Sequence, residues 1–167
     1  MNSVAAVLRV IDDAFDAIPR PAHFTNFAHC EECLEHDTTL RSCPRDQLTL
    51  EQLGRPESDP VTFCTPAAQA YLLPRLVRVA LDVSDDGQGG YFTQLLNHLY
   101  SGYTYNSLHQ FCRRDQRSAV HQLLLHVLEE HAGQVDEWRC ADELLSSLAL
   151  WSDDHAAIAP EQHTAIR

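Results

Sequence analysis

Apolar residues recur at intervals of three and four along most of this chain, the spacing that places them on one face of an α-helix. The segments that show this periodicity are residues 3–18, 66–82, 91–99, 115–131 and 136–151. Shorter helical turns are expected between them, and residues 61–64 have the pattern of a brief extended segment. We therefore predict an all-α, single-domain bundle of seven to eight helices over residues 1–152, followed by a polar tail over residues 153–167.

Proline, glycine and capping residues indicate where these helices begin and end. Thr65-Pro66 pairs an N-cap hydroxyl with a proline at the first helical position, which favours a helix start. Pro74 falls inside the helix that follows, so we expect a kink there or a division into two helices. The glycine-rich segment 84–90 is the clearest linker in the chain.

The last two helices have predicted boundaries of their own. Gly133 is expected to end the helix over residues 115–131, because glycine readily adopts the left-handed conformation at a helix C-terminus. Asp136 is expected to cap the final helix. The buried stripe of that helix is predicted to comprise Trp138, Ala141, Leu144, Leu145, Leu148 and Trp151.

The length and hydrophobicity of the chain are those of a globular protein. Its 167 residues, 44% of them hydrophobic, can bury a core without disulfides or metal ions as supports. No apolar run approaches the roughly 20 residues that a membrane-spanning helix needs. Arg9 and Asp12 interrupt the apolar N-terminus before the core of a signal peptide is complete. These features predict a soluble, cytoplasmic protein without a membrane partner.

Charged residues are biased towards acids, with 24 Asp and Glu against 12 basic residues and a net charge of −12. Every basic residue is Arg, so a Schiff-base lysine and the lysine of a phosphate-binding P-loop are excluded. Nucleic-acid binding is disfavoured, because neutralising phosphates needs clustered cations. The simplest interpretation of the acidity is a solvated surface. The functional interpretation is an acidic face that attracts a basic protein partner.

Sequence motifs for common reactions are lacking. The chain contains no glycine-rich phosphate loop, no Gly-x-Ser-x-Gly motif and no evident pair of catalytic carboxylates. Together with the small size and the acidity, this makes a non-enzymatic binding protein the leading hypothesis, for example an immunity or antitoxin-type inhibitor of a basic protein. The alternative is a metal-dependent enzyme or a small zinc-stabilised protein.

Side chains capable of chemistry are concentrated at residues 29–36. Cys30 and Cys33 have C-x-x-C spacing, which lets two thiolates reach one zinc ion from a tight turn. A tetrahedral site needs two further ligands, and the sequence leaves five candidates for them: His23, His29, His36, Cys43 and Cys64. Such a site would anchor the loop-rich segment 23–64 to the helices. The remaining cysteines, Cys112 and Cys140, lie among apolar neighbours in helical patterns and are predicted to be buried core thiols.

Two other interpretations of the C-x-x-C pair remain open. A redox pair needs a thiolate of low pKa at a helix N-terminus, and a short helix is expected over residues 30–40. Glu31 and Glu32 are expected to raise the thiol pKa, which argues against this role. Alternatively, both cysteines are core thiols without a further function. The neighbouring His36-Asp37 is similar to the paired metal ligands of helical phosphohydrolases, but the other His and Asp of that pattern have no clear counterpart here.

Three stretches of the chain resemble a family of uncharacterised bacterial proteins, a domain of unknown function. They are His29-Cys30-Glu31-Glu32-Cys33, the helix start Phe63-Cys64-Thr65-Pro66-Ala67-Ala68 running into Tyr71-Leu72-Leu73-Pro74, and Asp115-Gln116-Arg117-Ser118-Ala119-Val120. These stretches span most of residues 29–128. The resemblance implies a small helical bacterial protein, and it implies no particular activity.

Overall fold

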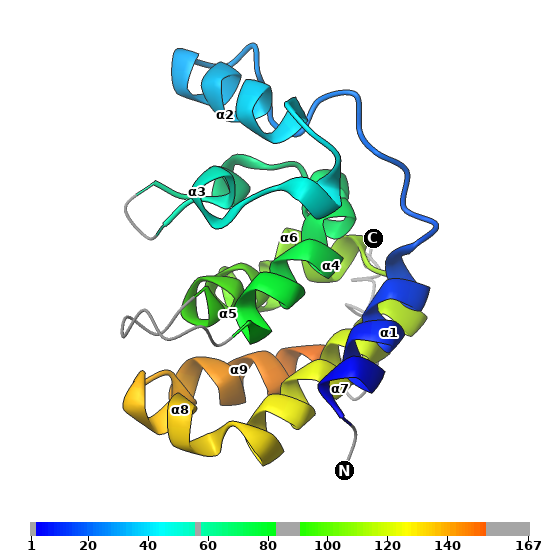
Figure 1. Ribbon diagram of the computed structural model, residues 1–167, viewed down its shortest axis with the longest axis vertical. Coiled ribbons are helices and arrows are strands. Elements are labelled where there is room, and N and C mark those ends of the chain that lie inside the picture. The colour runs from blue at the N-terminus through cyan, green and yellow to red at the C-terminus, as the bar shows by residue number, and fades with distance from the viewer. Residues whose placement is uncertain (1–2, 56–57, 83–90, 153–167) are drawn as a thin grey trace, which may run out of the picture.

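The computed structural model describes residues 3–55, 58–82 and 91–152, whose arrangement is shown in Figure 1. The α-helices in these ranges are α1 (Val4–Phe15), α2 (Glu31–Arg41), α3 (Leu50–Leu53), α4 (Pro66–Leu81), α5 (Phe92–Tyr100), α6 (Ser107–Phe111), α7 (Arg114–Glu130), α8 (Ala132–Glu137) and α9 (Ala141–Trp151). Three short 3₁₀-helices accompany them: η1 (Arg45–Gln47), η2 (Pro60–Phe63) and η3 (Tyr103–Tyr105). No strand occurs in the described ranges, where the only β-type pairs are two isolated bridges. The prediction of an all-α single domain is confirmed, with nine α-helices described where seven to eight were expected.

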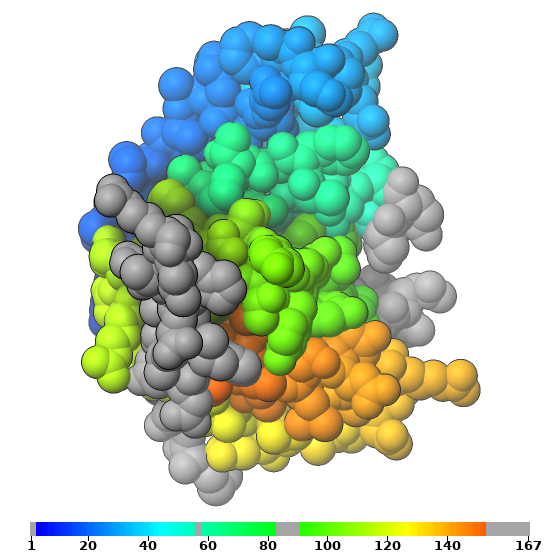
Figure 2. Space-filling model, turned by 180° about the vertical axis from the view of Figure 1, so that it is seen from behind, coloured from blue at the N-terminus to red at the C-terminus, as the bar shows by residue number. Residues whose placement is uncertain are grey.

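Helix α4 occupies the centre of the molecule, since residues around most of its circumference are buried. It packs against α1, α5 and α6, while α7 contacts α1 and α9, and α9 contacts α5. In Figure 1, α2 and α3 lie at one end of the molecule, with α7, α8 and α9 at the other. The view from behind in Figure 2 also places the α2 region, coloured blue to cyan, at the upper end.

The core is formed by the apolar stripes that the periodicity predicts. The stripe of α1 is completely or almost completely buried and consists of Val7, Ile11 and Phe15. Trp151 of α9 is also buried, and its Nε1 donates a 2.7 Å hydrogen bond to the carbonyl oxygen of Leu99 at the end of α5. Cys112 and Cys140 are both buried, as predicted.

Pro74 does not divide its helix. Helix α4 continues from Pro66 to Leu81 with Pro74 inside it, so of the two outcomes expected at Pro74, a kink or a division, the division does not occur. Proline removes one backbone hydrogen bond and crowds the preceding turn. Here Pro74 and the nearby Leu73 and Leu76 are buried in the core, and packing on several sides holds the segment helical despite that cost.

The boundaries around α8 also differ from those expected. Gly133 lies inside α8 and does not adopt a left-handed conformation, so it does not end α7, whose last residue is Glu130. Asp136 also belongs to α8, and α9 begins only after Cys140. The left-handed turn falls on Arg139, with φ of 54°, and allows the chain to enter α9 in a new direction.

Two further predictions about local structure are wrong. Two other predictions fall on residues outside the described ranges. Residues 61–64 do not form an extended segment, because η2 runs from Pro60 to Phe63 with the Asp59 side chain accepting a hydrogen bond from the Val61 N–H. Leu145 is 54% exposed and Ala141 is exposed as well, so neither belongs to the buried stripe of α9. The predicted linker 84–90 and the predicted tail 153–167 lie outside the described residues.

Candidate metal centre

The candidate centre lies where the loop after α1 joins α2. Cys30 is the N-cap of α2, with extended backbone angles (φ −159°, ψ 168°), and its Sγ accepts a hydrogen bond from the Cys33 backbone N–H at 3.4 Å. A sulfur therefore occupies the capping position that Ser, Thr, Asn or Asp usually takes. Glu31 and Glu32 follow in the first turn, where carboxylates are favoured by the positive end of the helix dipole. This capping geometry directs the Cys30 sulfur towards Cys33.

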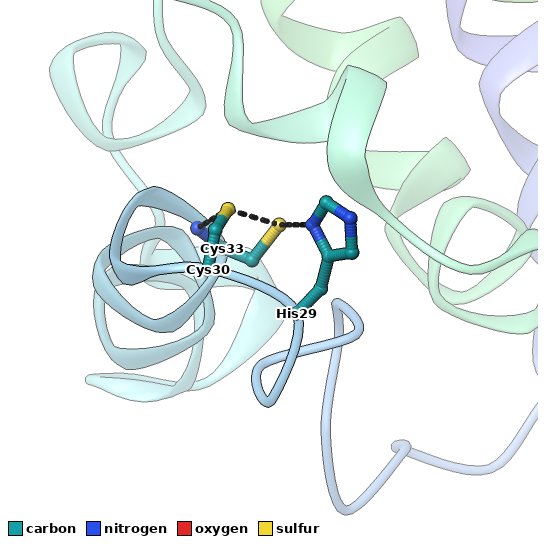
Figure 3. Close-up of side chains that lie close together, drawn as sticks. All are labelled: His29, Cys30 and Cys33. Carbon is teal, nitrogen blue, oxygen red and sulfur yellow. Dashed lines mark hydrogen bonds between the residues drawn. The ribbon is translucent and has the colours of Figure 1, made fainter.

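Three metal-binding side chains converge at this helix start (Figure 3). The Cys33 sulfur lies between the other two, 3.2 Å from the Cys30 sulfur and 3.8 Å from Nδ1 of His29. All three donor atoms lie within 4.8 Å of one another. A tetrahedral zinc ion, with Zn–S near 2.3 Å and Zn–N near 2.0 Å, spaces its ligands roughly 3.4–3.8 Å apart. Small side-chain rotations would therefore bring these donors around one ion.

The two thiols differ in exposure and in pKa. Cys30 is exposed, whereas Cys33 is buried, with 6% of its surface accessible. The pKa of Cys30 is lowered, first by the hydrogen bond from the Cys33 backbone N–H and then by contacts with the Cys33 thiol and with His29. The pKa of Cys33 is raised, chiefly by its hydrogen bond with Cys30, with a smaller contribution from Glu32. The expected effect of the glutamates is thus found at Cys33, where Glu32 helps to raise the pKa, and not at Cys30, whose pKa is lowered by the hydrogen bonds to its sulfur.

Two of the predicted histidine candidates lie outside this group. His36 is one turn beyond Cys33 on α2, and its ring packs against Phe63 with centroids 4.8 Å apart. Its Nε2 lies 3.6 Å from a carboxylate oxygen of Glu32. His23 stacks on Phe27, with ring centroids 3.9 Å apart, and makes its polar contact with Asp37. Of the three candidate histidines, the structure brings only His29 to the two cysteines.

The other two cysteine candidates are also separate from the group. Cys43 follows the C-terminus of α2, and its Sγ lies 4.0 Å from Nε2 of Gln52. Cys64 is buried, and its Sγ donates a hydrogen bond to the Pro60 carbonyl oxygen at 3.6 Å. Burial strongly raises the pKa of Cys64 and so keeps it protonated, whereas a zinc ligand has to be a thiolate. The structure thus places Cys43 and Cys64 away from His29, Cys30 and Cys33.

Asp37 positions the loop that carries the site. One oxygen of this buried carboxylate accepts hydrogen bonds from the backbone N–H groups of Phe24 at 2.6 Å and Thr25 at 3.3 Å. The other oxygen lies 2.9 Å from Nδ1 of His23. Burial raises the pKa of Asp37, but the hydrogen bonds from His23 and the two backbone groups outweigh it, so the pKa lies below its ordinary value. Asp37 is therefore an anchor for the loop, and it is not part of the donor group found among the described residues.

Comparison of the chain with family models, with curated proteins and with solved structures finds no match. The resemblance to an uncharacterised bacterial family therefore stays a prediction. Among the helices of the described ranges, none has both the length and the apolar character needed to cross a bilayer. The strongest indication of function is thus the group of donors at the start of α2.

Proposed function

We propose that this protein binds one zinc ion through His29, Cys30 and Cys33. The observation that supports this function is the convergence of two thiols and one imidazole within 4.8 Å at a helix N-terminus. Thiolate and imidazole are the ligands that zinc prefers in proteins, and soft sulfur donors disfavour magnesium and calcium. The lowered pKa of Cys30 favours the thiolate that a metal needs.

The fourth ligand in this proposal comes from outside the group. Because Cys30 and His29 are exposed, water or a group from a partner can complete the tetrahedron. Catalytic zinc sites commonly have three protein ligands and one open position, so a metal-dependent enzyme would use the same donors. Within the chain, the ion would join the loop residue His29 to the first turn of α2. None of the three ligands belongs to the main apolar cluster of the described residues, so the ion would not be needed to fill it.

Metal analysis of the purified protein tests this proposal. Protein supplied with zinc and then freed of excess metal should retain about one ion per chain, and Cys30→Ser and Cys33→Ser should each abolish retention, because a hydroxyl is a poor zinc ligand. Cys43→Ser is the matched control, since this partly buried thiol follows the same helix but lies outside the donor group. Lack of zinc in the wild-type protein, or full retention in both Cys30→Ser and Cys33→Ser, would overturn the proposal.

A second candidate function is binding of a basic protein, as an immunity or antitoxin-type inhibitor does. Helix α2 supports it, because Glu31, Glu32 and Glu35 are all exposed on this helix together with Leu34, which is 49% exposed. With the net charge of −12, this surface is suited to a cationic partner whose approach is accelerated by electrostatic attraction. Capture of partners from the native host at low and at high salt tests it. A basic protein that binds only at low salt is expected, and the lack of any salt-sensitive partner would contradict this function.

A further inference from the structure

We propose that Cys30 and Cys33 are a redox switch: a hydroperoxide converts them to a disulfide, and this oxidation releases the bound metal. The release rests on the proposed zinc-binding function, whereas formation of the disulfide does not. The observation behind the switch is the pairing of one exposed and one buried thiol whose sulfur atoms lie 3.2 Å apart.

The geometry of the pair requires little movement to form a bond. A disulfide bond is about 2.05 Å long, so the two sulfur atoms have to approach each other by about 1.1 Å. Both belong to the same helix start, where Cys30 is the N-cap and Cys33 lies in the first turn. The C-x-x-C spacing at a helix N-terminus is the arrangement that thiol–disulfide oxidoreductases use. Side-chain rotation, without rearrangement of the helix, therefore suffices.

The two thiols have different roles in this reaction. Cys30 is exposed and meets the oxidant. Cys33 is buried, and its sulfur lies between the Cys30 sulfur and the His29 imidazole (Figure 3). Nδ1 of His29, 3.8 Å from the Cys33 sulfur, is placed to take up the proton that Cys33 loses. The exposed thiol is thus the attacking group and the buried thiol the resolving group.

The remaining cysteines in the described residues lack such a neighbour. Cys64, Cys112 and Cys140 are buried, and all three pKa values are raised, mainly by burial, so these thiols are protonated and shielded. Cys43 is partly buried next to Gln52. Oxidation by a mild hydroperoxide should therefore be confined to the pair at the start of α2.

The chemical balance of the switch is simple. Cys30 sulfur attacks the peroxide oxygen and becomes a sulfenic acid, while one molecule of water leaves when the oxidant is hydrogen peroxide. Cys33 sulfur then attacks the Cys30 sulfur, forming the disulfide and releasing a second water. In total, the two thiols lose two electrons and two protons, and the peroxide gains them. A disulfide sulfur carries no negative charge and binds zinc poorly, so the ion is released.

The experiment treats metal-free and zinc-loaded wild-type protein with a small excess of hydrogen peroxide and follows three signals: free thiols, the intact mass and zinc captured by a chromogenic chelator. Two free thiols per chain should disappear, and the intact mass should fall by two hydrogen atoms. In the zinc-loaded sample, zinc should be released at the same rate as the thiols are lost. Dithiothreitol should restore both thiols and zinc binding. Cys33→Ser should stop at a Cys30 sulfenic acid that dimedone traps, Cys30→Ser should form no disulfide, and Cys43→Ser should behave like the wild type.

The metal-free and the zinc-loaded samples test the redox switch and the proposed zinc site separately. A disulfide in the metal-free sample supports the switch at Cys30 and Cys33 even if no zinc binds, an outcome that overturns only the proposed zinc site. Failure of the metal-free wild type to form this disulfide, or formation of a disulfide by other cysteines, overturns the switch. Retention of zinc after the disulfide has formed overturns its coupling to metal release.

Discussion

Thr25 Oγ1 donates a 2.7 Å hydrogen bond to the backbone carbonyl oxygen of Cys33. Thr25 is itself buried, and it also forms an isolated antiparallel bridge with Cys64 before α4. One residue thus connects the loop before the site, the first turn of α2 and the segment that leads into the central helix. The position of Cys33 relative to the core is therefore determined by hydrogen bonds that are independent of any metal.

Asp37→Asn should destabilise the protein by about 2–4 kcal/mol. The substitution removes the charge that His23 and the backbone N–H groups of Phe24 and Thr25 contact, and buried hydrogen bonds to charged groups are among the stronger ones. Urea unfolding followed by circular dichroism measures the change. Asp115→Asn is the control, because Asp115 pairs with Arg113 on the exposed surface, where water and salt screen the attraction, so its loss should destabilise the protein far less. Equal effects of the two substitutions would contradict the anchoring role of Asp37.

The stability of the fold should decrease in acid below about pH 4. The pKa values of Asp37 and Asp59 are both lowered in the folded protein. Burial raises each of them, but hydrogen bonds to the carboxylates outweigh it. These hydrogen bonds come from His23 and the loop backbone for Asp37, and from His98 and Gln94 for Asp59. The ordinary pKa of 3.8 applies in the unfolded chain, so the stabilisation is complete above that value and is lost as the pH falls through the lower folded-state pKa.

Urea midpoints measured from pH 6 to pH 2 test this acid dependence. In the wild type a carboxylate oxygen of Asp59 lies 3.1 Å from Nε2 of His98. Asp59→Asn should make the urea midpoint depend less on pH, because the amide does not titrate in this range. A wild-type midpoint that stays constant down to pH 2 would show that neither carboxylate is stabilised by the fold.

Trp151→Phe should cost about 2–4 kcal/mol of stability. The change leaves a cavity in the core and deprives the Leu99 carbonyl oxygen of its 2.7 Å hydrogen bond. Leu145→Ala on the same helix should cost less than about 1 kcal/mol, since that side chain is 54% exposed. Thermal or urea unfolding of both variants gives the comparison. A larger loss in Leu145→Ala than in Trp151→Phe would mean that α9 buries a different face.

The differences between the predicted and observed helices have identifiable causes. The long apolar stripes of α1, α4 and α7 could be predicted, because helical periodicity repeats over several turns in each. The region around Gly133 and Asp136 could not, because terminating and capping residues are local signals, and here the chain turns at Arg139 instead. The effect of Pro74 depends on tertiary packing, which no local pattern reports.

The sequence predicts only those parts of the candidate site that depend on local geometry. Cys30 and Cys33 are close in sequence, so their convergence follows from the geometry of a single turn. His29 could not be distinguished from the other candidate ligands, because the choice depends on which way the preceding loop turns. The role of Asp37 was missed, since its partners lie 12 to 14 residues away. One sequence signal does exist: Asp37 is four residues from Cys33 and so lies on the same face of α2.

Cobalt substitution tests the central claim, that His29, Cys30 and Cys33 hold one metal ion, most directly. Cobalt(II) reports its own coordination: tetrahedral geometry gives intense visible bands, and thiolate ligands add a strong charge-transfer band in the near ultraviolet. Titration of the reduced wild-type protein should produce both, saturating near one ion per chain. The charge-transfer band should be weakened or lost in Cys30→Ser and in Cys33→Ser and unchanged in Cys43→Ser. A weak octahedral spectrum in the wild type, or a thiolate band that survives in the Cys30→Ser Cys33→Ser double variant, would contradict the claim.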